Sequence, residues 1–391
     1  MYIHRANNET LLDIAQEYDV NPMILMGINQ LEQTKQLSPG QEILILIPTR
    51  TVNVKKGETL EEICHRFGVR EDRIIANNPM LGGRRKIYGG QLLCIKYGTP
   101  IYGMAVRNGY MYSACPLSTL KERIYYLDIL TLCSAVWRNS KLYSIFDDRA
   151  AIEYATENCK QCFLRVYLTE SPSEEQIEGL LNSLSIIVGS AGYDGVTIGG
   201  ISRVSNPVRL IKEANEKLHG INKQLYVEIT QNDDPLLADM CDGGILTYEK
   251  LNLDDIPSFQ EGEEKYFTSI CETSRVERCF IELSSFAYGG GKFIEKDKVI
   301  EAACRKGCIF EEDAERLINR VSIGGRKPSE YIFESLKNLK AKLELVNNLG
   351  YMGIAFDIMR ARMSELMMVE AIFSSATKIG SSSILNCQGE M

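Results

Sequence analysis

The segment Tyr193-Asp194-Gly195-Val196-Thr197-Ile198-Gly199-Gly200-Ile201 indicates the fold of the larger part of this chain. It is a short apolar run that follows an amphipathic helix expected at Glu174–Val188 and precedes polar loop residues. An apolar run of this length between turn residues is typical of a strand buried on both faces, as in a parallel sheet. The segment therefore predicts an α/β architecture.

Seven further apolar runs alternate with amphipathic helices between residues 100 and 376. In the helix expected at Ser335–Asn348, for example, Leu336, Leu339 and Leu343 form one face at helical spacing. Eight strands with intervening helices predict a (β/α)8 TIM barrel. The predicted strands are Ile101–Val106, Ile129–Val136, Phe163–Leu168, Gly195–Ile201, Leu225–Thr230, Gly243–Tyr248, Cys279–Phe286 and Gly353–Ile358.

An internal repeat occupies the first part of the chain. Residues 2–48 align with residues 51–97 at an offset of 49, which becomes 50 near the end of the unit. Each copy is expected to run strand, helix, helix, strand, and in the second copy Thr59 and Glu62 have the spacing of a capping box. The repeat predicts two small βααβ units before the barrel.

Composition and charge exclude several classes of protein. A hydrophobic content of 45% and a charged content of 25% are those of a globular chain, and a net charge of −8 argues against nucleic acid as a partner. We expect no membrane span, because no apolar run is long enough. The start at Met1-Tyr2-Ile3 shows no apolar leader, so we expect cytoplasmic synthesis without a signal peptide. The twelve cysteines are then expected to be reduced.

The two repeat units resemble LysM modules. In the second unit, the segments Lys55–Leu60, Phe67–Val69, Asn78–Pro79 and Gly90–Leu92 follow the family pattern, and the first unit departs from it slightly at Asn8–Leu11. The resemblance implies binding of an N-acetylglucosamine polymer, peptidoglycan or chitin, in a groove between the first strand–helix loop and the second helix–strand loop. The implied groove residues are Asn8, Glu9, Thr10, Asn29, Gln30 and Leu31 in the first unit and Gly57, Glu58, Thr59, Asn78, Pro79, Met80 and Leu81 in the second.

The threonines and asparagines of this set are also the residues that helix caps and turns require, so two roles stay open for them. A single module would bind weakly, and two in tandem raise the effective concentration for a polymer.

Residues 100–376 resemble the family 18 glycoside hydrolases, whose fourth strand carries the signature Asp-Gly-x-Asp-x-Asp-x-Glu. Asp194-Gly195 matches its start, Gly243–Glu249 is similar to the sixth strand of the family, and Phe333–Leu343 is similar to the helix before strand eight. Residues 290–330 would be a shortened form of the insertion after strand seven. Two LysM modules before such a barrel is the layout of the spore cortex-lytic N-acetylglucosaminidases of spore-forming bacteria.

The resemblance also shows which catalytic groups are missing. Family 18 catalysis uses the acetamido oxygen of the substrate as nucleophile, so the protein supplies a glutamic acid and an orienting aspartate. The alignment places Thr197, Gly199 and Ile201 where the family has its two further aspartates and the acid. Loss of a general acid alone removes roughly 10²–10⁴ of the rate. We therefore expect no catalytic residues on strand four.

Other residues are candidates for a cleft in the barrel. Tyr248, Glu249 and Asp357 lie at or near predicted strand ends, and Asp357 stands where the family usually has tryptophan. A relocated pair of acids is the alternative, drawn from Glu228, Glu249, Glu282 and Asp357.

No metal or cofactor is expected. The only tryptophan, Trp137, is not assigned a role, and His4, His65 and His219 form no catalytic triad or metal set. Four interpretations are open for the pairs Cys159/Cys162 and Cys304/Cys308: zinc ligands, a redox motif for the first pair, thiols without a metal, or cross-linking groups.

The expected organisation is a first LysM module at 1–48, a second at 51–97, a degenerate barrel at 100–376 and a flexible tail at 377–391. The leading hypothesis is a non-catalytic glycan-binding or assembly protein, made in the mother-cell cytosol and placed in the spore envelope with other envelope proteins. The alternatives are an active N-acetylglucosaminidase with relocated acids, and a structural spore-coat protein that uses the LysM units for protein docking.

Overall fold

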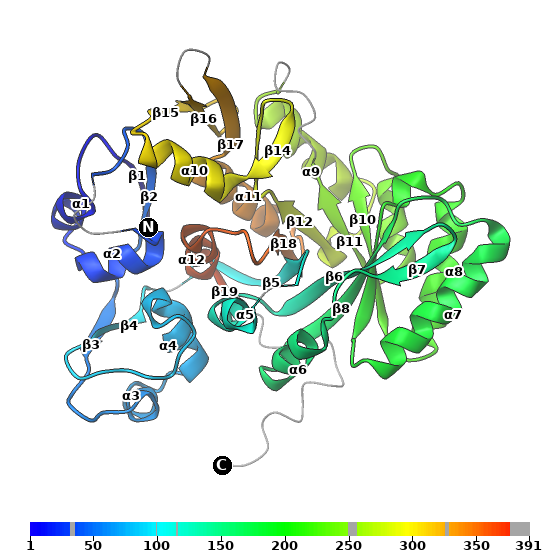
Figure 1. Cartoon of the computed structure of the whole chain (residues 1–391), viewed down its shortest axis with the longest axis horizontal. Helices are drawn as coiled ribbons and strands as arrows, with labels where there is room; N and C mark the ends of the chain where they lie inside the picture. Colours follow the sequence, from blue (N-terminus) through cyan, green and yellow to red (C-terminus); the bar gives the residue numbers. More distant parts are fainter. Residues whose placement is uncertain (32–35, 99, 115, 249–255, 325–327, 376–391) are drawn as a thin grey trace.

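The two small units lie on one side of a barrel. A separate antiparallel sheet lies beside the first of these units and the barrel (Figure 1). In the part of the chain that the structure describes, no helix combines the length and apolarity needed to cross a bilayer. The computed structural model describes residues 1–31, 36–98, 100–114, 116–248, 256–324 and 328–375.

The first unit consists of a two-stranded antiparallel sheet and two helices that share one apolar core. The first helix begins at a capping box, in which the Asp13 backbone N–H donates to the Thr10 hydroxyl over 3.2 Å and the Thr10 N–H donates to the Asp13 carboxylate over 2.8 Å. Such a cap stabilises a helix by about 1 kcal/mol. The elements are β1 (Tyr2–Arg5), α1 (Leu11–Glu17), α2 (Pro22–Asn29) and β2 (Glu42–Ile45).

The second unit has the same order, so the βααβ prediction is confirmed for both. The predicted capping box is present: the Glu62 N–H donates to the Thr59 hydroxyl, and the Glu62 carboxylate accepts from the Thr59 N–H. The first helix ends at Gly68, whose left-handed backbone (φ 63°) favours glycine. The elements are β3 (Arg50–Asn53), α3 (Leu60–Phe67), α4 (Glu71–Asn77), the 3-10 turn η1 (Pro79–Leu81) and β4 (Leu92–Lys96).

Eight parallel strands form a closed barrel, as predicted. The ring is closed because its first strand, β5, pairs with both the second strand, β6, and the last, β18. All eight predicted strands are present in the predicted order. They are β5 (Tyr102–Met111), β6 (Ile129–Arg138), β8 (Gln161–Leu168), β9 (Gly195–Gly199), β10 (Gln224–Thr230), β11 (Gly243–Thr247), β12 (Cys279–Leu283) and β18 (Gly353–Asp357).

The predicted extent of the first strand was wrong. Only the residues of β5 from Val106 onward pair with barrel strands, and its earlier part pairs with the short strand β19 (Phe373–Ser375). Two polar residues, Arg107 and Asn108, interrupt the apolar run, and this gave a strand end at Val106. Both are buried in the structure, and Arg107 is balanced there by the carboxylates of Asp128 and Glu370.

Helices surround the barrel, and their apolar faces form one large core with the outward-facing strand residues. The predicted helix before strand four begins at Glu174 as expected, and the helix before strand eight begins at Leu336. The helices are α5 (Leu117–Arg123), α6 (Arg149–Glu157), α7 (Glu174–Ser190), α8 (Pro207–His219), α9 (Lys265–Cys271), α11 (Leu336–Leu349) and α12 (Met363–Ile372). Shorter elements are β7 (Lys141–Ser144) and the turns η2 (Ile124–Tyr126), η3 (Ile201–Arg203), η4 (Pro235–Met240), η6 (Gln260–Glu264) and η7 (Val276–Arg278).

An antiparallel sheet of five strands is inserted between strands seven and eight of the barrel. It runs from Phe286 to Glu334, so it is longer than the expected insertion at 290–330. Phe286, which was expected at the end of strand seven, and Phe333 and Glu334, which were expected in a helix, belong to this sheet. Its elements are β13 (Phe286–Gly289), β14 (Lys292–Glu295), α10 (Lys296–Arg305), β15 (Phe310–Asp313), β16 (Ile318–Ile323) and β17 (Ser329–Glu334).

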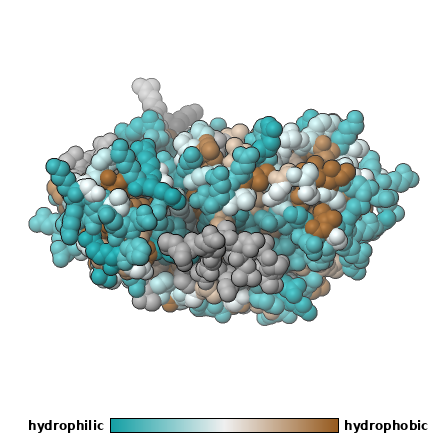
Figure 2. Space-filling view, turned by 90° about the horizontal axis from the view of Figure 1, so that it is seen from below, coloured by the Kyte–Doolittle hydropathy of each residue, from teal (hydrophilic) through white to brown (hydrophobic). Residues whose placement is uncertain are grey.

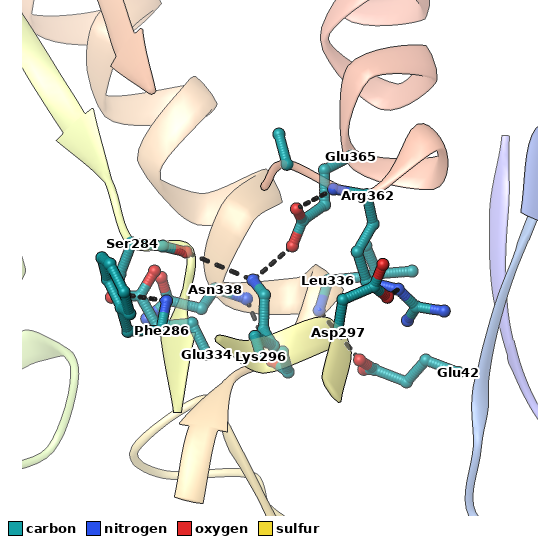
Figure 3. Close-up of polar contacts among 12 residues, drawn as sticks. Glu42, Ser284, Phe286, Lys296, Asp297, Glu334, Leu336, Asn338, Arg362 and Glu365 are labelled. Atoms are coloured by element: carbon teal, nitrogen blue, oxygen red, sulfur yellow. Dashed lines mark hydrogen bonds and ion pairs between the residues drawn. The ribbon is translucent and has the colours of Figure 1, made fainter. Parts of the chain in front are cut away.

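Polar contacts fix the first unit and the inserted sheet to the barrel helices (Figure 3). The Glu42 carboxylate accepts from the Leu336 backbone N–H at the start of α11 over 2.9 Å, and burial raises the pKa of this carboxyl. The Lys296 ammonium lies between the Ser284 carbonyl and the Glu365 carboxylate. These contacts join three parts of the chain far apart in sequence.

The second unit contacts both the barrel and the first unit. Its Arg73 forms an ion pair with Glu370 of α12, which also binds Arg107 inside the fold. A Cβ atom on Gly27 of the first unit would lie only 2.7 Å from Cγ of Met80, so the two units touch at this point. The repeat units are therefore packed into the body of the molecule.

Candidate functional site

Asp194, the first residue of the strand-four signature, lies at the amino-terminal end of the barrel. It precedes β9, and its carboxylate accepts a hydrogen bond from the Cys162 N–H over 2.8 Å. Burial raises the pKa of Asp194. Active sites of such barrels form at the opposite, carboxyl-terminal face. Asp194 therefore joins two strands and lies away from any site at the barrel mouth.

The remaining signature positions offer no acid. Thr197 is fully buried, and its hydroxyl has no hydrogen-bond partner among the described residues. A Cβ atom on Gly199 would lie 2.1 Å from Oε2 of Glu228 and 2.9 Å from Nη2 of Arg165, so no side chain fits there as the neighbours stand. Ile201 is 2% exposed and packs in the main apolar core.

An ion pair fills the space next to Gly199. Arg165 on β8 donates from Nε and Nη2 to the two carboxylate oxygens of Glu228 on β10, over 2.5 and 2.7 Å. Burial opposes the positive charge of Arg165, but the carboxylate of Glu228 outweighs it, so the pKa of Arg165 lies above its usual value. Arg165 was not among the expected site residues. The only signal for it is a charged residue within the apolar strand Phe163–Leu168.

A cleft of about 240 Å³ opens at the carboxyl-terminal ends of β11, β12 and β18, beneath the inserted sheet. Of the three expected cleft residues, Tyr248 and Asp357 line it, and Glu249 lies outside the described residues. The aromatic side chains from the inserted sheet were not anticipated. The cleft is lined by Tyr112, Thr247, Tyr248, Glu282, Leu283, Ser284, Ser285, Phe286, Tyr288, Phe293, Ile318, Ile332, Phe333, Glu334, Lys342 and Asp357.

Two carboxyl groups line this cleft from the ends of barrel strands. Burial, reinforced by the nearby Glu228, raises the pKa of Glu282 to about 7, although the Thr247 hydroxyl donates a hydrogen bond to it. The Asp357 carboxylate accepts from the Met359 N–H over 2.9 Å and pairs with the Arg360 guanidinium. Glu282 is therefore a carboxyl that holds its proton up to near-neutral pH.

The asparagines expected in the LysM grooves lie inside the units instead. Asn29 and Asn78 are 5% and 7% exposed. In each, the amide nitrogen donates to a helix carbonyl and a strand carbonyl, and the amide oxygen accepts from the strand N–H of Leu44 or Cys94. These contacts use the hydrogen-bonding groups that a glycan would need. Both residues therefore hold the loop shape, which is the structural role that the sequence left open for them.

In the first unit, hydrogen bonds join the two loops that should flank the groove. The Gln36 side chain donates to the Asn8 carbonyl over 2.9 Å, and the Leu37 N–H donates to the Glu9 carbonyl over 2.9 Å. The Glu9 carboxylate is engaged by His4 at 2.8 Å, and Thr10 caps α1. Of the other two expected residues, Gln30 is exposed with a left-handed backbone and Leu31 is half-buried. The first unit therefore offers little open groove.

In the second unit the corresponding residues leave more surface open. Gly57 has a left-handed backbone (φ 80°), and nothing lies within 4 Å of its Cβ position. Met80 is 52% exposed, whereas Leu81 belongs to the core and Pro79 begins η1. Thr59 caps α3, and the Glu58 carboxylate is paired with Arg66 at 2.9 Å. Gly57 and Met80 therefore remain exposed among the residues implied for the groove.

His4 lies beside two carboxylates of the first unit. Ligand atoms of His4, Glu9 and Glu17 lie within 4.8 Å of one another, and among the described residues no other such group occurs. The ion pair with Glu9 and the contact with the Tyr18 hydroxyl at 3.2 Å already account for the position of the ring.

The cysteine pairs do not come together as a metal site within the described residues. Cys159 is exposed, whereas Cys162 is buried on β8 and burial raises its pKa to about 12. Cys304 and Cys308 are half-buried in the inserted sheet. Trp137 packs in the outer core and does not line the barrel cleft.

Comparison with known proteins identifies the repeat units. Residues 6–46 and 52–96 match the sequence family of the LysM domain, so the repeat units are LysM domains. No curated protein sequence matches the chain. The solved structures that resemble it share the barrel.

Two of these structures span nearly the whole chain. The spore cortex-lytic enzyme SleL from Bacillus megaterium QM B1551 is 15% identical, with a TM-score of 0.72 over 96% of this chain and 99% of that chain. SleL from Bacillus cereus is 12% identical, with a TM-score of 0.70 over the same shares of each chain. The chitinase-like agglutinin RobpsCRA from Robinia pseudoacacia is 13% identical, with a TM-score of 0.56 over 68% of this chain and 99% of that chain. At these identities the likeness shows a common fold.

Proposed function

We propose that this chain is a non-catalytic glycan-binding or assembly protein that recognises an N-acetylglucosamine-containing polymer, peptidoglycan or a chitin-like chain, through its LysM domains. One observation carries the non-catalytic part. The Arg165–Glu228 ion pair fills the space at Gly199, and Ile201, at the position of the family 18 acid, is buried in the core. A general acid must donate a proton to the leaving oxygen, and an isoleucine side chain has no proton to donate.

The binding part rests on the second LysM domain. Gly57 is exposed with nothing within 4 Å of its Cβ position, and Met80, which touches Gly27 of the first unit, still presents an apolar side chain that is 52% exposed. A sugar with an acetamido group needs both a polar partner for the amide and an apolar surface for the methyl group. The first domain, with its joined loops, contributes packing against the barrel.

The proposed place in the cell is supported by two solved structures that cover nearly the whole chain. The two SleL structures are spore cortex-lytic enzymes. We place this chain in the spore envelope, close to peptidoglycan and to other envelope proteins, after synthesis in the mother-cell cytosol. The barrel would then serve as a rigid body that holds the LysM domains.

Sedimentation of the full-length protein with insoluble peptidoglycan or chitin tests this function. We expect the protein to pellet with at least one polymer and the Met80→Ala variant to bind about threefold to tenfold more weakly, because burial of the sulfur-containing side chain against the sugar is lost. Met104→Ala, an exposed methionine on β5, is the matched control and should bind as the wild type does. Failure to pellet with either polymer would contradict glycan binding and favour protein docking by the LysM domains.

A second candidate function is supported by Glu282. Its carboxyl lines the barrel cleft with a pKa raised to about 7, and Asp357 lines the same cleft. A protonated carboxyl beside a carboxylate is the arrangement that glycosidases use. On this alternative the chain is an N-acetylglucosaminidase with relocated acids. Hydrolysis of peptidoglycan that Glu282→Gln abolishes, with binding retained, would establish it and overturn the non-catalytic proposal.

A further inference from the structure

The two LysM domains carry opposite charge. Residues 2–48 contain two Lys and Arg against six Asp and Glu, a net charge of −4. Residues 51–97 contain nine Lys and Arg against five Asp and Glu, a net charge of +4. Because the two domains share one fold, this difference is a property of their surfaces.

Most acids of the second domain are already engaged. Glu58 pairs with Arg66, Asp72 pairs with Arg70, and Glu71 pairs with Arg85. Glu62 caps α3. Within the described residues, no ion pair joins a carboxylate to Lys55, Lys56, Arg84 or Lys86, which are four of the exposed cations of this domain. The positive surplus therefore lies on the surface rather than inside ion pairs.

These four cations adjoin the two loops that the LysM resemblance implies for the groove. Lys55 and Lys56 directly precede Gly57 of the first loop. Arg84 follows the second loop, and its N–H donates to the Leu81 carbonyl over 3.1 Å. The turn at Gly89 packs on the first pair, because a Cβ there would lie 3.0 Å from Cα of Lys56.

Lys86 lies two residues after Arg84, and its ammonium lies over the Tyr88 ring, 5.3 Å from the ring centroid. Figure 2 shows a mostly hydrophilic surface on the side of the molecule where the LysM domains lie.

The first domain lacks these charges at the aligned positions. The repeat places Ala6 and Asn7 opposite Lys55 and Lys56, and Gln36 opposite Lys86. Gln36 instead joins the two loops of its own domain. The cations are therefore not a requirement of the LysM fold, since the same chain builds the fold without them.

We infer that the second LysM domain selects an anionic N-acetylglucosamine polymer, one that bears carboxylates along the chain as peptidoglycan does through its lactyl and peptide groups, over a neutral polymer such as chitin. The inference deepens the proposed function and rests on it. Exposed cations on both sides of a groove create a positive potential that raises affinity and association rate for an anionic chain. Their reach is about 8 Å at physiological ionic strength, which covers substituents of a sugar bound in the groove.

The residues of the first domain supply the matched variant. The triple variant replaces three cations of the full-length protein by the residues that the first domain has at the aligned positions. The substitutions are Lys55→Ala, Lys56→Asn and Lys86→Gln. All three side chains are exposed, so the fold should be retained. The control replaces three exposed lysines outside the LysM domains, Lys212→Gln, Lys306→Gln and Lys340→Gln, which removes the same charge from the chain.

Binding is measured on insoluble peptidoglycan and on chitin at about 50 and 500 mM salt. For the wild type and the control, we expect peptidoglycan binding to be the stronger at low salt and to fall at high salt. We expect the triple variant to bind peptidoglycan about tenfold more weakly at low salt and chitin unchanged, since each lost charge contributes a small, screened amount.

Equal and salt-independent binding of both polymers by the wild type, or an equal loss in the control, would overturn the selectivity while leaving glycan binding in place. Absence of binding to both polymers would overturn the proposed function itself.

Discussion

Replacing Arg165 by methionine should lower the free energy of unfolding by about 3–5 kcal/mol, because it leaves the Glu228 carboxylate without its partner in the barrel interior. The two side chains are 12% and 16% exposed and form two parallel hydrogen bonds. Removal of one member of such a pair costs more than the pair contributes, since the remaining charge has lost its solvation. Urea denaturation followed by circular dichroism measures the change.

Two further variants separate the ion pair from other roles of the arginine. The double variant Arg165→Met, Glu228→Met should recover most of the stability, because no buried charge remains. Arg209→Met removes a half-buried arginine of α8 whose ion pairs with Glu174 and Glu213 lie near solvent, and it should change the unfolding midpoint little. A double variant as unstable as Arg165→Met alone would show that Arg165 acts through packing with its aromatic neighbours rather than through its charge.

Titration of Glu282 should lower the free energy of unfolding by about 3 kcal/mol as the pH rises from 4.5 to 7. The pKa of this carboxyl is raised from 4.5 to about 7 by burial and by Glu228. Between these two pH values the folded chain keeps a proton that the unfolded chain releases, so a higher pH favours unfolding. The stabilisation is fully present below about pH 4.5 and is lost above about pH 7.

Comparison with Glu282→Gln isolates this group from all others that titrate. The stability of the variant relative to the wild type should rise by about 3 kcal/mol from pH 4.5 to pH 7, because glutamine carries no charge at either pH. In Thr247→Val, which removes the hydrogen bond to the carboxylate, the pH-dependent loss should become larger. Parallel stability profiles of the wild type and Glu282→Gln would contradict a raised pKa at this position.

The sequence predicts the elements of this fold well because the signals are local. Each barrel strand is a short apolar run, and the capping box of Thr59 and Glu62 fixes a helix start from two residues alone. The repeat offset likewise identified both LysM domains. The main error, at the first strand, arose where Arg107 and Asn108 are buried. Glu370, which pairs with Arg107, lies far away in the sequence, and Asn108 accepts a hydrogen bond from Thr131 of the next barrel strand.

The candidate site was less predictable because it depends on contacts between distant segments. Arg165 and Glu228 are 63 residues apart, and nothing in either strand indicates that they meet beside Gly199. The aromatic wall of the cleft comes from an inserted sheet whose extent was underestimated. Among four strand-end acids, only the surroundings of Glu282 distinguish it.

The two LysM domains illustrate the same limit. Asn29 and Asn78 fit both a ligand role and a structural role in the sequence, and their hydrogen bonds assign the structural one. In the first domain, Gln36 and Leu37 form the hydrogen bonds that join the two loops, and no sequence motif around these residues predicts those bonds. Sequence likeness between repeats therefore does not imply that both copies present the same groove.

The central claim, that the barrel has become a scaffold behind a glycan-binding domain, is tested most directly by analysing the products after incubation with peptidoglycan. The full-length protein is mixed with purified peptidoglycan for a day at pH 5 and pH 7, and the soluble fraction is examined by mass spectrometry for new reducing ends. We expect the protein in the pellet and no soluble muropeptide fragments above a protein-free control. Release of fragments that depends on the added protein would contradict the claim.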